Sequence, residues 1–361
     1  MAATEQTVHD AFDMRRHLHV GQVIPAHPLA LLPTRAMDER HQRALTRYYV
    51  AAGAGGMAVG VHTTGFPIHD AKIGLYRPVL ELAADTADRA LARDPRAFVR
   101  VAGLMGDTAQ AVREAQIAQA LGYHCGLLSL GAWRDATEAA ILAHCAHVSE
   151  VLPLFGFYLQ PAVGGRRLSY AFWREFAEIP NVVAIKVAPF DRYATMDVVR
   201  ALADAGRDDI ALYTGNDDAI VPDLVTDVPV TSGGRAYTRH FVGGLLGQWA
   251  VWTSRAVEML REIQAWRASG VDTLPREWLT RGAALTMANA AIFDAAHRYQ
   301  GCLPGILEML RLQGLVRGTW TFDTHEQLSA GQSDALARLS AQYPDLSDDE
   351  FVAERLDEFL A

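Results

Sequence analysis

The amino-acid sequence predicts an α/β fold: a (β/α)8 barrel, or TIM barrel, with a helical C-terminal extension. Eight short runs rich in β-branched residues alternate with longer segments of helical periodicity, over roughly the 250 residues that such a barrel needs. Alternation of this kind favours parallel strands joined by right-handed crossovers. A doubly wound open sheet shares the alternation, but no GxGxxG motif follows the first run, which weakens its dinucleotide-binding version.

The predicted elements follow one another along the first two thirds of the chain. The strand candidates are residues 21–26, 56–61, 97–103, 125–130, 154–158, 182–186, 211–214 and 228–231. Among the helices between them, residues 107–122 end in Gly122, a common residue after a helix. Residues 135–152 begin at Asp135, whose carboxylate suits the N-terminal cap.

Beyond residue 235 the pattern is helical only. The helical segments are residues 243–266, 285–299 and 303–315, followed by an acidic amphipathic tail over 345–361. We therefore expect a barrel over residues 1–235, including a short N-terminal segment, and a C-terminal helical region over 236–361 packed on it.

Composition excludes several classes of function. The net charge of −9 argues against binding a nucleic-acid backbone, which needs clustered basic surface. The three cysteines are odd in number and lack CxxC spacing, so we expect reduced thiols without a disulfide framework or a zinc site. No apolar stretch approaches the ~20 residues of a membrane span, and the N-terminus lacks an apolar signal region. We expect a cytoplasmic protein with no cofactor, no metal, and neither nucleic acid nor membrane as partner.

One lysine stands out. Of the 33 lysines and arginines only Lys72 and Lys186 are lysines, and Lys186 lies inside the apolar run of the sixth predicted strand. A structural ion pair or an extended side chain that reaches solvent would explain it. Arginine serves wherever only charge is wanted, however, and a desolvated lysine can lose its proton and attack a carbonyl carbon. Retention of lysine here favours amine chemistry.

Three motifs at strand ends resemble one family. "AIK" ends the sixth strand, "FYLQP" contains a tyrosine at the end of the fifth, and "TTG" follows the second. With "VAGLMGDTAQAVREAQIAQALG" and "TGNDD", their order and spacing over residues 20–318 resemble the dihydrodipicolinate synthase / N-acetylneuraminate lyase family. The resemblance implies a (β/α)8 barrel, a Schiff base with a 2-oxo acid such as pyruvate, an aldehyde partner, and a homodimer or homotetramer.

The resemblance also implies roles for single residues. Lys186 would form the imine, Tyr158 would shuttle protons beside it, and Thr63 and Thr64 with the turn amides at Gly65 would hold the carboxylate. These roles suit the residue types, because a phenol can move protons and a Gly-containing turn can bind an anion. We count Lys186, Tyr158 and Thr63 as catalytic candidates.

Departures from the family pattern bear on the substrate. The usual GTTGE reads "HTTGF" here, with His62 and Phe66, and the usual PYY reads "GAW", with Trp133 where a relay tyrosine often stands. These changes make the predicted pocket more apolar, which favours a hydrophobic or aromatic aldehyde over aspartate semialdehyde. Besides Thr64 and Gly65, the expected substrate-binding residues are therefore Phe66, Trp133 and Gly233, the last in a glycine pair that lets a ligand approach the backbone or forms a tight turn.

An arginine that binds the second substrate in some family members would fall near Val163, with Arg166 and Arg167 as possible substitutes. The acidic run after the seventh strand, Asn216 to Asp218, is expected to cap the following helix.

Two alternatives stay open. A metal-dependent hydrolase barrel could use His17, His19, His62 and His69 with a carbamylated lysine, although a zinc site needs three or more converging ligands. A barrel that binds a 2-oxo acid without turnover would explain the missing tyrosine at Trp133.

Overall fold

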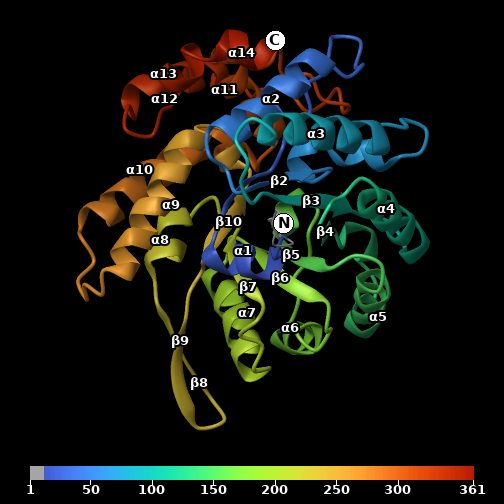
Figure 1. The fold of residues 1–361 in the computed structure, drawn as a ribbon, viewed down its shortest axis with the longest axis vertical. Coiled ribbons are helices and arrows are strands. Elements are labelled where there is room, and N and C mark those ends of the chain that lie inside the picture. Colours follow the sequence, from blue (N-terminus) through green and yellow to red (C-terminus); the bar gives the residue numbers. More distant parts are fainter. Residues whose placement is uncertain (1–11) are drawn as a thin grey trace, which may run out of the picture.

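A closed parallel barrel forms the centre of the molecule. The computed structural model describes residues 12–361; the start of the predicted barrel segment, residues 1–11, lies outside the described residues. Eight strands form one sheet in the order β1-β10-β7-β6-β5-β4-β3-β2, and all their pairings are parallel. A bridge between Ala26 and Ala58 joins its first and last strands. The predicted (β/α)8 barrel is thereby confirmed (Figure 1).

The elements have the following bounds. The barrel strands are β1 (Val23–Pro25), β2 (Gly56–Val59), β3 (Val99–Leu104), β4 (Cys125–Leu128), β5 (Leu154–Leu159), β6 (Val182–Ala188), β7 (Ala211–Thr214) and β10 (Gly243–Leu246). The helices between strands are α2 (Glu39–Ala51), α3 (Tyr76–Leu91), α4 (Thr108–Ala120), α5 (Glu138–Ser149), α6 (Tyr170–Phe176), α7 (Arg192–Asp204) and α8 (Ile220–Val225). Before the barrel lies α1 (Met14–Val20), and after it come α9 (Thr253–Ala268), α10 (Glu277–Ile292), α11 (Cys302–Leu312), α12 (Gln332–Gln342), α13 (Asp349–Ala353) and α14 (Leu356–Leu360).

Short 3-10 turns follow several strands. They are η1 (His62–Thr64), η2 (Phe66–His69), η3 (Gly131–Trp133), η4 (Pro161–Val163), η5 (Gln248–Ala250) and, after α10, η6 (Ala295–His297).

Side chains of the strands fill two apolar layers. Alternate residues point into the barrel, where Phe155, Phe157 and Val183 belong to the inner cluster. The residues between them, such as Tyr158 and Ile185, pack outward against the helices. Strands buried on both faces read as nearly continuous apolar runs, which is why these segments are easy to find in the sequence.

The eighth barrel strand differs from the prediction. Residues 228–231, predicted to be that strand, lie in β8 (Val228–Ser232), which pairs antiparallel with β9 (Arg235–Arg239) in a hairpin outside the barrel. Its turn is the pair Gly233 and Gly234, both with positive φ, as two-residue hairpin turns favour. The barrel strand is β10, in a segment predicted to be helical, so the barrel extends past the predicted boundary at residue 235.

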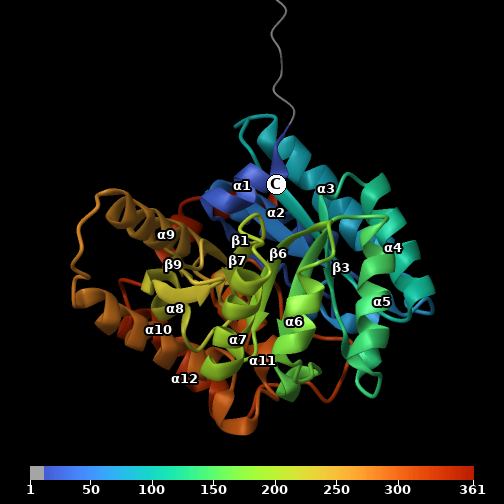
Figure 2. The ribbon, with the colours of Figure 1, turned by 90° about the horizontal axis from the view of Figure 1, so that it is seen from below.

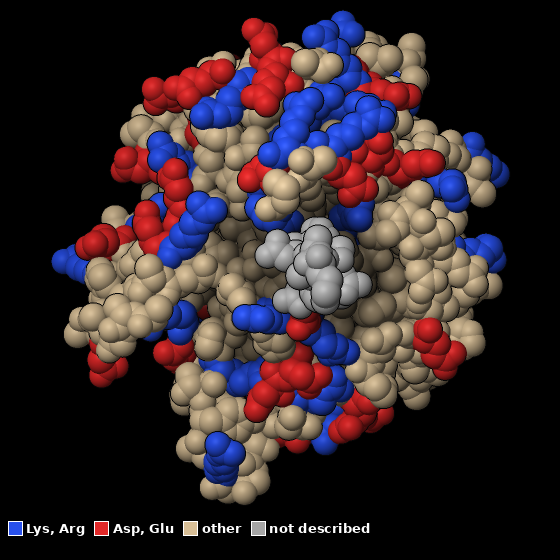
Figure 3. All heavy atoms as spheres, viewed as in Figure 1, with Lys and Arg blue, Asp and Glu red and all other residues tan. Residues whose placement is uncertain are grey.

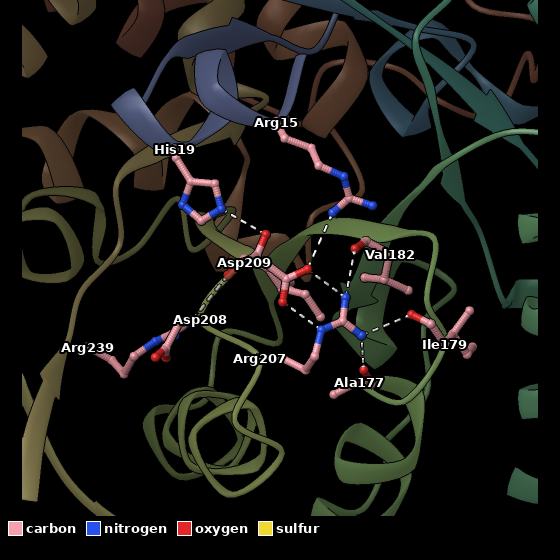
Figure 4. A network of polar contacts seen from close by, with 10 residues as sticks. Arg15, His19, Ala177, Ile179, Val182, Arg207, Asp208, Asp209 and Arg239 are labelled. Atoms are coloured by element: carbon pink, nitrogen blue, oxygen red, sulfur yellow. Dashed lines mark hydrogen bonds and ion pairs between the residues drawn. The ribbon is translucent and has the colours of Figure 1, made fainter. Parts of the chain in front are cut away.

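The amino-terminal end of the barrel is closed by α1. His19 Nε2 lies 2.7 Å from the carbonyl oxygen of Asp209, and Arg15 pairs with the Asp209 carboxylate. Arg207 holds the same carboxylate and donates to carbonyl oxygens just before and at the start of β6 (Figure 4). This network fixes α1 to the starts of β6 and β7, at the opposite end of the barrel from α11 and α12 (Figure 2).

The last helices return to the start of the chain. Tyr48 of α2 donates to the buried carboxylate of Asp348 at 2.8 Å, and Arg47 donates to the carbonyl oxygen of Phe359 at 2.6 Å. In Figure 1, α13 and α14 lie beside α2 at the top of the molecule, where Phe351 and Phe359 pack against Tyr48.

Charges of both signs are interspersed on the face seen in Figure 3. Arginines gather over α2 and α3, but Asp85 and Asp94 lie among them and pair with Arg43 and Arg96. No helix of residues 12–361 is long and apolar enough to cross a membrane.

Candidate active site

Two adjoining cavities open at the carboxyl ends of the strands, where barrel proteins bind their ligands. The deep cavity is about 40 Å³ and has Lys186 in its wall. The outer cavity is about 450 Å³ and is lined by loops after β2 and β5 and by residues 298–326 of the C-terminal region. The two share five lining residues: His62, Thr63, Val163, Tyr299 and Cys302. A ligand bound at Lys186 would therefore be reached through the outer cavity.

Lys186 is held inside the barrel by its position on β6. It is opposite Phe157 of β5 and Tyr213 of β7, and its side chain is 7% exposed. The ammonium nitrogen lies 4.7 Å from the centre of the Phe157 ring, so aromatic surface replaces water on that side. Gly215 after β7 leaves the room for the chain: a Cβ there would lie 2.7 Å from Lys186 Cε.

Burial makes this amine easier to deprotonate. Desolvation lowers the pKa of Lys186, because a buried ammonium loses its hydration, and the nearby carboxylate of Asp217 opposes the shift in part. Burial raises the pKa of Asp217, against the backbone N–H of Gln248, which donates to its carboxylate at 3.0 Å, and the charge of Lys186. His62 faces the same cavity, and burial and the charge of Lys186 lower its pKa to about 4. The imidazole is therefore neutral at neutral pH.

The TTG turn divides its roles. Thr63 is buried and lines both cavities, as expected for a residue that meets the substrate. The hydroxyl of Thr64 accepts from the N–H of Gly60 at 2.9 Å and donates to the carbonyl oxygen of His27 at 2.7 Å. The N–H of Gly65 donates to the carbonyl oxygen of His62 at 2.9 Å. Both Thr64 and Gly65 line the outer cavity, but these hydrogen bonds show that they stabilise the conformation of the turn.

Tyr158, expected beside Lys186, points away from the cavity. Its hydroxyl donates to the carbonyl oxygen of Leu168 at 3.2 Å, and its ring packs 5.1 Å from that of Trp173 on α6. The structure pairs Phe157 with Lys186 and Tyr158 with Val187, so successive side chains of β5 are turned inward and outward, respectively. The prediction that Tyr158 shuttles protons at Lys186 is wrong for this geometry.

Two expected substrate-binding residues lie elsewhere. The indole N–H of Trp133 donates to the carbonyl oxygen of Gly106 at 3.0 Å, and its ring stacks on His144 of α5 at 4.5 Å, away from both cavities. Gly233 is at the hairpin turn between β8 and β9, where a Cβ would meet nothing within 4 Å. Phe66, in contrast, lines the outer cavity and packs 5.6 Å from His62.

The two arginines after β5 are engaged outside the cavities. Arg166 donates to the carbonyl oxygens of Trp133 and Ala136 at 3.0 and 2.8 Å, and Arg167 pairs with Asp191. Val163 lines both cavities, and Arg298 lines the outer one.

The acidic run after β7 contributes to the site. The following helix α8 begins after Ala219 without a side-chain cap, so the expected capping role is wrong. Asn216 donates to Thr195 and Asp223, and Asp217 lines the deep cavity. A carboxylate placed directly after a barrel strand is a signal that sequence reasoning could have weighted more.

Tyr299 was missed altogether. It lies in a segment predicted to be helical, yet α10 ends at Ile292, and Tyr299 reaches both cavities from the loop before α11. No motif in the sequence marks it, because its place at Lys186 depends on how the C-terminal region packs.

The histidines proposed for a metal hydrolase do not converge. His17 and His19 lie on α1 at the opposite end of the barrel, bonded to carbonyl oxygens of Gly55 and Asp209. His69 is buried against Glu114 at 3.0 Å. Among residues 12–361, no three His, Cys, Asp or Glu side chains are grouped to hold a metal ion.

Sequence comparisons give partial matches. No family model matches the chain. It is 26% identical over 208 residues to 4-hydroxy-tetrahydrodipicolinate synthase of Bifidobacterium longum, covering 56% of this chain and 63% of that protein. It is 29% identical over 117 residues to the enzyme of the same name from Exiguobacterium sibiricum, covering 32% and 39%. The chain thus matches less than two thirds of the length of these curated relatives.

Structural comparisons cover most of the chain. A prophage protein of the dihydrodipicolinic acid synthase family from E. coli, solved with pyruvate, matches with a TM-score of 0.72 at 18% identity, over 90% of this chain and 98% of that one. N-acetylneuraminate lyase from Fusobacterium nucleatum matches with a TM-score of 0.68 at 17% identity, over 90% and 99%.

Fold and site together define a closed (β/α)8 barrel whose cavity, at the carboxyl ends of the strands, is built around one buried lysine. Part of its sequence is similar to 4-hydroxy-tetrahydrodipicolinate synthases, and its fold matches solved structures of the dihydrodipicolinate synthase and N-acetylneuraminate lyase kind. Within this fold, the tyrosine of β5 is turned outward, away from Lys186.

Proposed function

We propose that the protein is a lyase of the class I aldolase kind, which forms a Schiff base between Lys186 and pyruvate or a related 2-oxo acid and joins it to, or cleaves it from, an aldehyde. The observation that carries the proposal is a desolvated lysine with a lowered pKa in the wall of a cavity at the strand ends. Its neutral amine can attack a ketone carbon, and the resulting iminium stabilises negative charge on the adjacent carbon.

The surroundings support this chemistry. Thr63 offers a hydroxyl to the carboxylate of the 2-oxo acid in the deep cavity. His62 is neutral because of its lowered pKa, so it does not repel the positive charge of an iminium formed beside it. Phe157 and Ala188 exclude water from the same cavity.

The chain offers a matched pair of variants for the test. Borohydride reduction with pyruvate should add one reduced adduct, which peptide mass spectrometry should locate on Lys186. Lys72, exposed and the only other lysine in the sequence, supplies the control. Lys72→Arg should keep the adduct, whereas Lys186→Arg should abolish it, because guanidinium is not a nucleophile at neutral pH. An active Lys186→Arg enzyme would refute the mechanism.

The aldehyde partner is proposed to be hydrophobic or aromatic. Trp133 does not contribute to this preference, but Phe66, Leu303, Trp320 and Phe322 line the outer cavity through which the partner would approach. Apolar walls favour an apolar substrate because its surface leaves water on binding. Assays with pyruvate and aldehydes of graded polarity test this, and a clear preference for aspartate semialdehyde would contradict it. We further propose a homodimer or homotetramer, which light scattering in solution would establish.

A turned-away Tyr158 favours a second candidate, a barrel that binds a 2-oxo acid without turnover. An adduct at Lys186 without turnover of any aldehyde would support it. The choice depends on whether another group can move protons at the imine.

A further inference from the structure

We propose, on the basis of the Schiff-base function above, that Tyr299 is the acid–base catalyst at Lys186, a role for which β5 supplies no inward-pointing phenol. Tyr299 comes from the loop between α10 and α11, in the C-terminal region, and not from a barrel strand.

Position is the first support. Tyr299 lines the deep cavity together with Lys186, Asp217 and Gln160, and also lines the outer cavity. Its ring packs edge-on against Phe190, which follows β6, with 5.9 Å between ring centres. Among the tyrosines of residues 12–361, Tyr299 alone lines either of these two cavities. It therefore stands between the reacting amine and the route by which the aldehyde enters.

The loop that carries Tyr299 is built to hold a set shape. Asp294, Arg298 and Tyr299 all have positive φ, at 56°, 57° and 66°. Such conformations are unfavourable for residues other than glycine, and they persist only where the surroundings enforce them, often at functional sites.

Buried polar contacts enforce this shape. The carboxylate of Asp294, 4% exposed, accepts from the N–H of Gly301 at 3.0 Å and from the hydroxyl of Ser329 at 2.6 Å. The amide of Gln332 donates to the carbonyl oxygens of Ala291 and Gly301, both at 3.1 Å. Residues far along the chain thus clamp both ends of a loop of about eight residues, whose interior places Tyr299 in the cavity.

The protonation state fits the role. Burial, with the negative charges of Asp218 and Asp217, raises the pKa of Tyr299, against a hydrogen bond with Gln160. The phenol is therefore protonated at neutral pH and can donate.

The proposed step is the loss of water from the carbinolamine. The neutral amine of Lys186 bonds to the ketone carbon, and one proton passes from the nitrogen to the carbonyl oxygen, which becomes the hydroxyl of the carbinolamine. Tyr299 donates its proton to this hydroxyl as the C–O bond breaks, and water leaves while the nitrogen lone pair forms the C=N bond. A proton from solvent then restores the phenol. Overall, the neutral amine, the ketone and one proton give a protonated imine and one water, and the phenol is unchanged.

Rapid-quench borohydride trapping with pyruvate tests the assignment. Tyr299→Phe keeps the ring that packs on Phe190 and removes only the hydroxyl, so the rate of adduct formation should fall by about a hundredfold or more, the usual size of a general-acid contribution. Tyr299→Asn, which tolerates positive φ, should show the same loss if the phenylalanine variant does not fold. Tyr158→Phe is the matched control and should trap at the wild-type rate.

The outcomes separate the two proposals. A Tyr299→Phe protein that folds and traps pyruvate at the wild-type rate overturns the role of Tyr299 and leaves the Schiff-base function in place. A rate loss in Tyr158→Phe with none in Tyr299→Phe returns the role to β5. If wild-type protein forms no adduct with pyruvate or other 2-oxo acids, the proposed function itself is refuted.

Discussion

Gly215→Ala should damage the site by displacing the side chain of Lys186, although the substitution replaces no reactive group. The new Cβ would lie 2.7 Å from both Lys186 Cε and Ala188 Cβ, whereas ordinary contact begins at 3.4 Å, so these groups must move by roughly 0.7 Å. The lysine chain can swing, but Ala188 is part of β6, so the strands themselves must separate. Overpacking of this kind costs about 1–3 kcal/mol in unfolding free energy. A nucleophile misplaced by nearly 1 Å should form the imine some tenfold to hundredfold more slowly.

Urea unfolding and borohydride trapping of the same preparations measure the two effects. Gly131→Ala is the control. Gly131 begins η3 after β4, has no positive φ and lines neither cavity, and a Cβ there would come no nearer than 3.3 Å to other atoms. It should lose little stability and no trapping rate. The packing of Gly215 on Lys186 is refuted if Gly215→Ala retains wild-type stability and rate.

Three further predictions follow from the site. Asp217→Asn removes the carboxylate that raises the pKa of Lys186, so the rise of trapping rate with pH should move to lower pH; a move to higher pH would contradict the assigned coupling. Gln332→Met removes the donors that hold the 294–301 loop, so it should lower unfolding free energy by about 1–3 kcal/mol and lower kcat more than it raises the KM for pyruvate. Phe322→Ala should raise the KM for an aromatic aldehyde about tenfold, for a loss near 1.4 kcal/mol, and leave that for acetaldehyde unchanged; equal effects on both would argue against the apolar route.

Seven of the eight barrel strands could be found in the sequence because each is a short, mostly apolar run. The eighth, β10, could not, because it begins with Gly243 and Gly244, which have low strand propensity. Their role appears only in the closed barrel: a Cβ on Gly243 would lie 2.5 Å from the backbone oxygen of Gln22. The segment of β8 has the stronger local signal, so the sequence predicts residues 228–231 as the eighth strand in place of β10.

Lys186 could be predicted as a site residue because a charged side chain inside an apolar strand segment is unusual. The direction in which the Tyr158 side chain points could not be predicted. Both faces of β5 are apolar, and "FGFYL" has an aromatic residue for either face. The pairing of β5 with β6 is irregular between Leu154 and Phe155, and a shift of one residue exchanges the two faces of a strand. A residue such as Tyr158 can therefore match a motif by its position in the sequence while its side chain points away from the site.

The site residues come from both barrel strands and loops, and the two kinds of segment differ in how firmly they hold a side chain. Strands place Lys186 with little freedom, because β6 is paired with β5 on one side and β7 on the other at this residue. Loops at the strand ends can change without disturbing the barrel, so the proton donor is the group most free to move to another segment. The predicted division at residue 235 falls before the last barrel strand, β10. Both cavities draw residues from either side of it, with Thr63 before and Tyr299 and Cys302 after. In the proposed mechanism the C-terminal region is therefore part of the site. Without it we expect Lys186 to lie in an open, hydrated cleft, where its pKa would return toward that of an ordinary lysine.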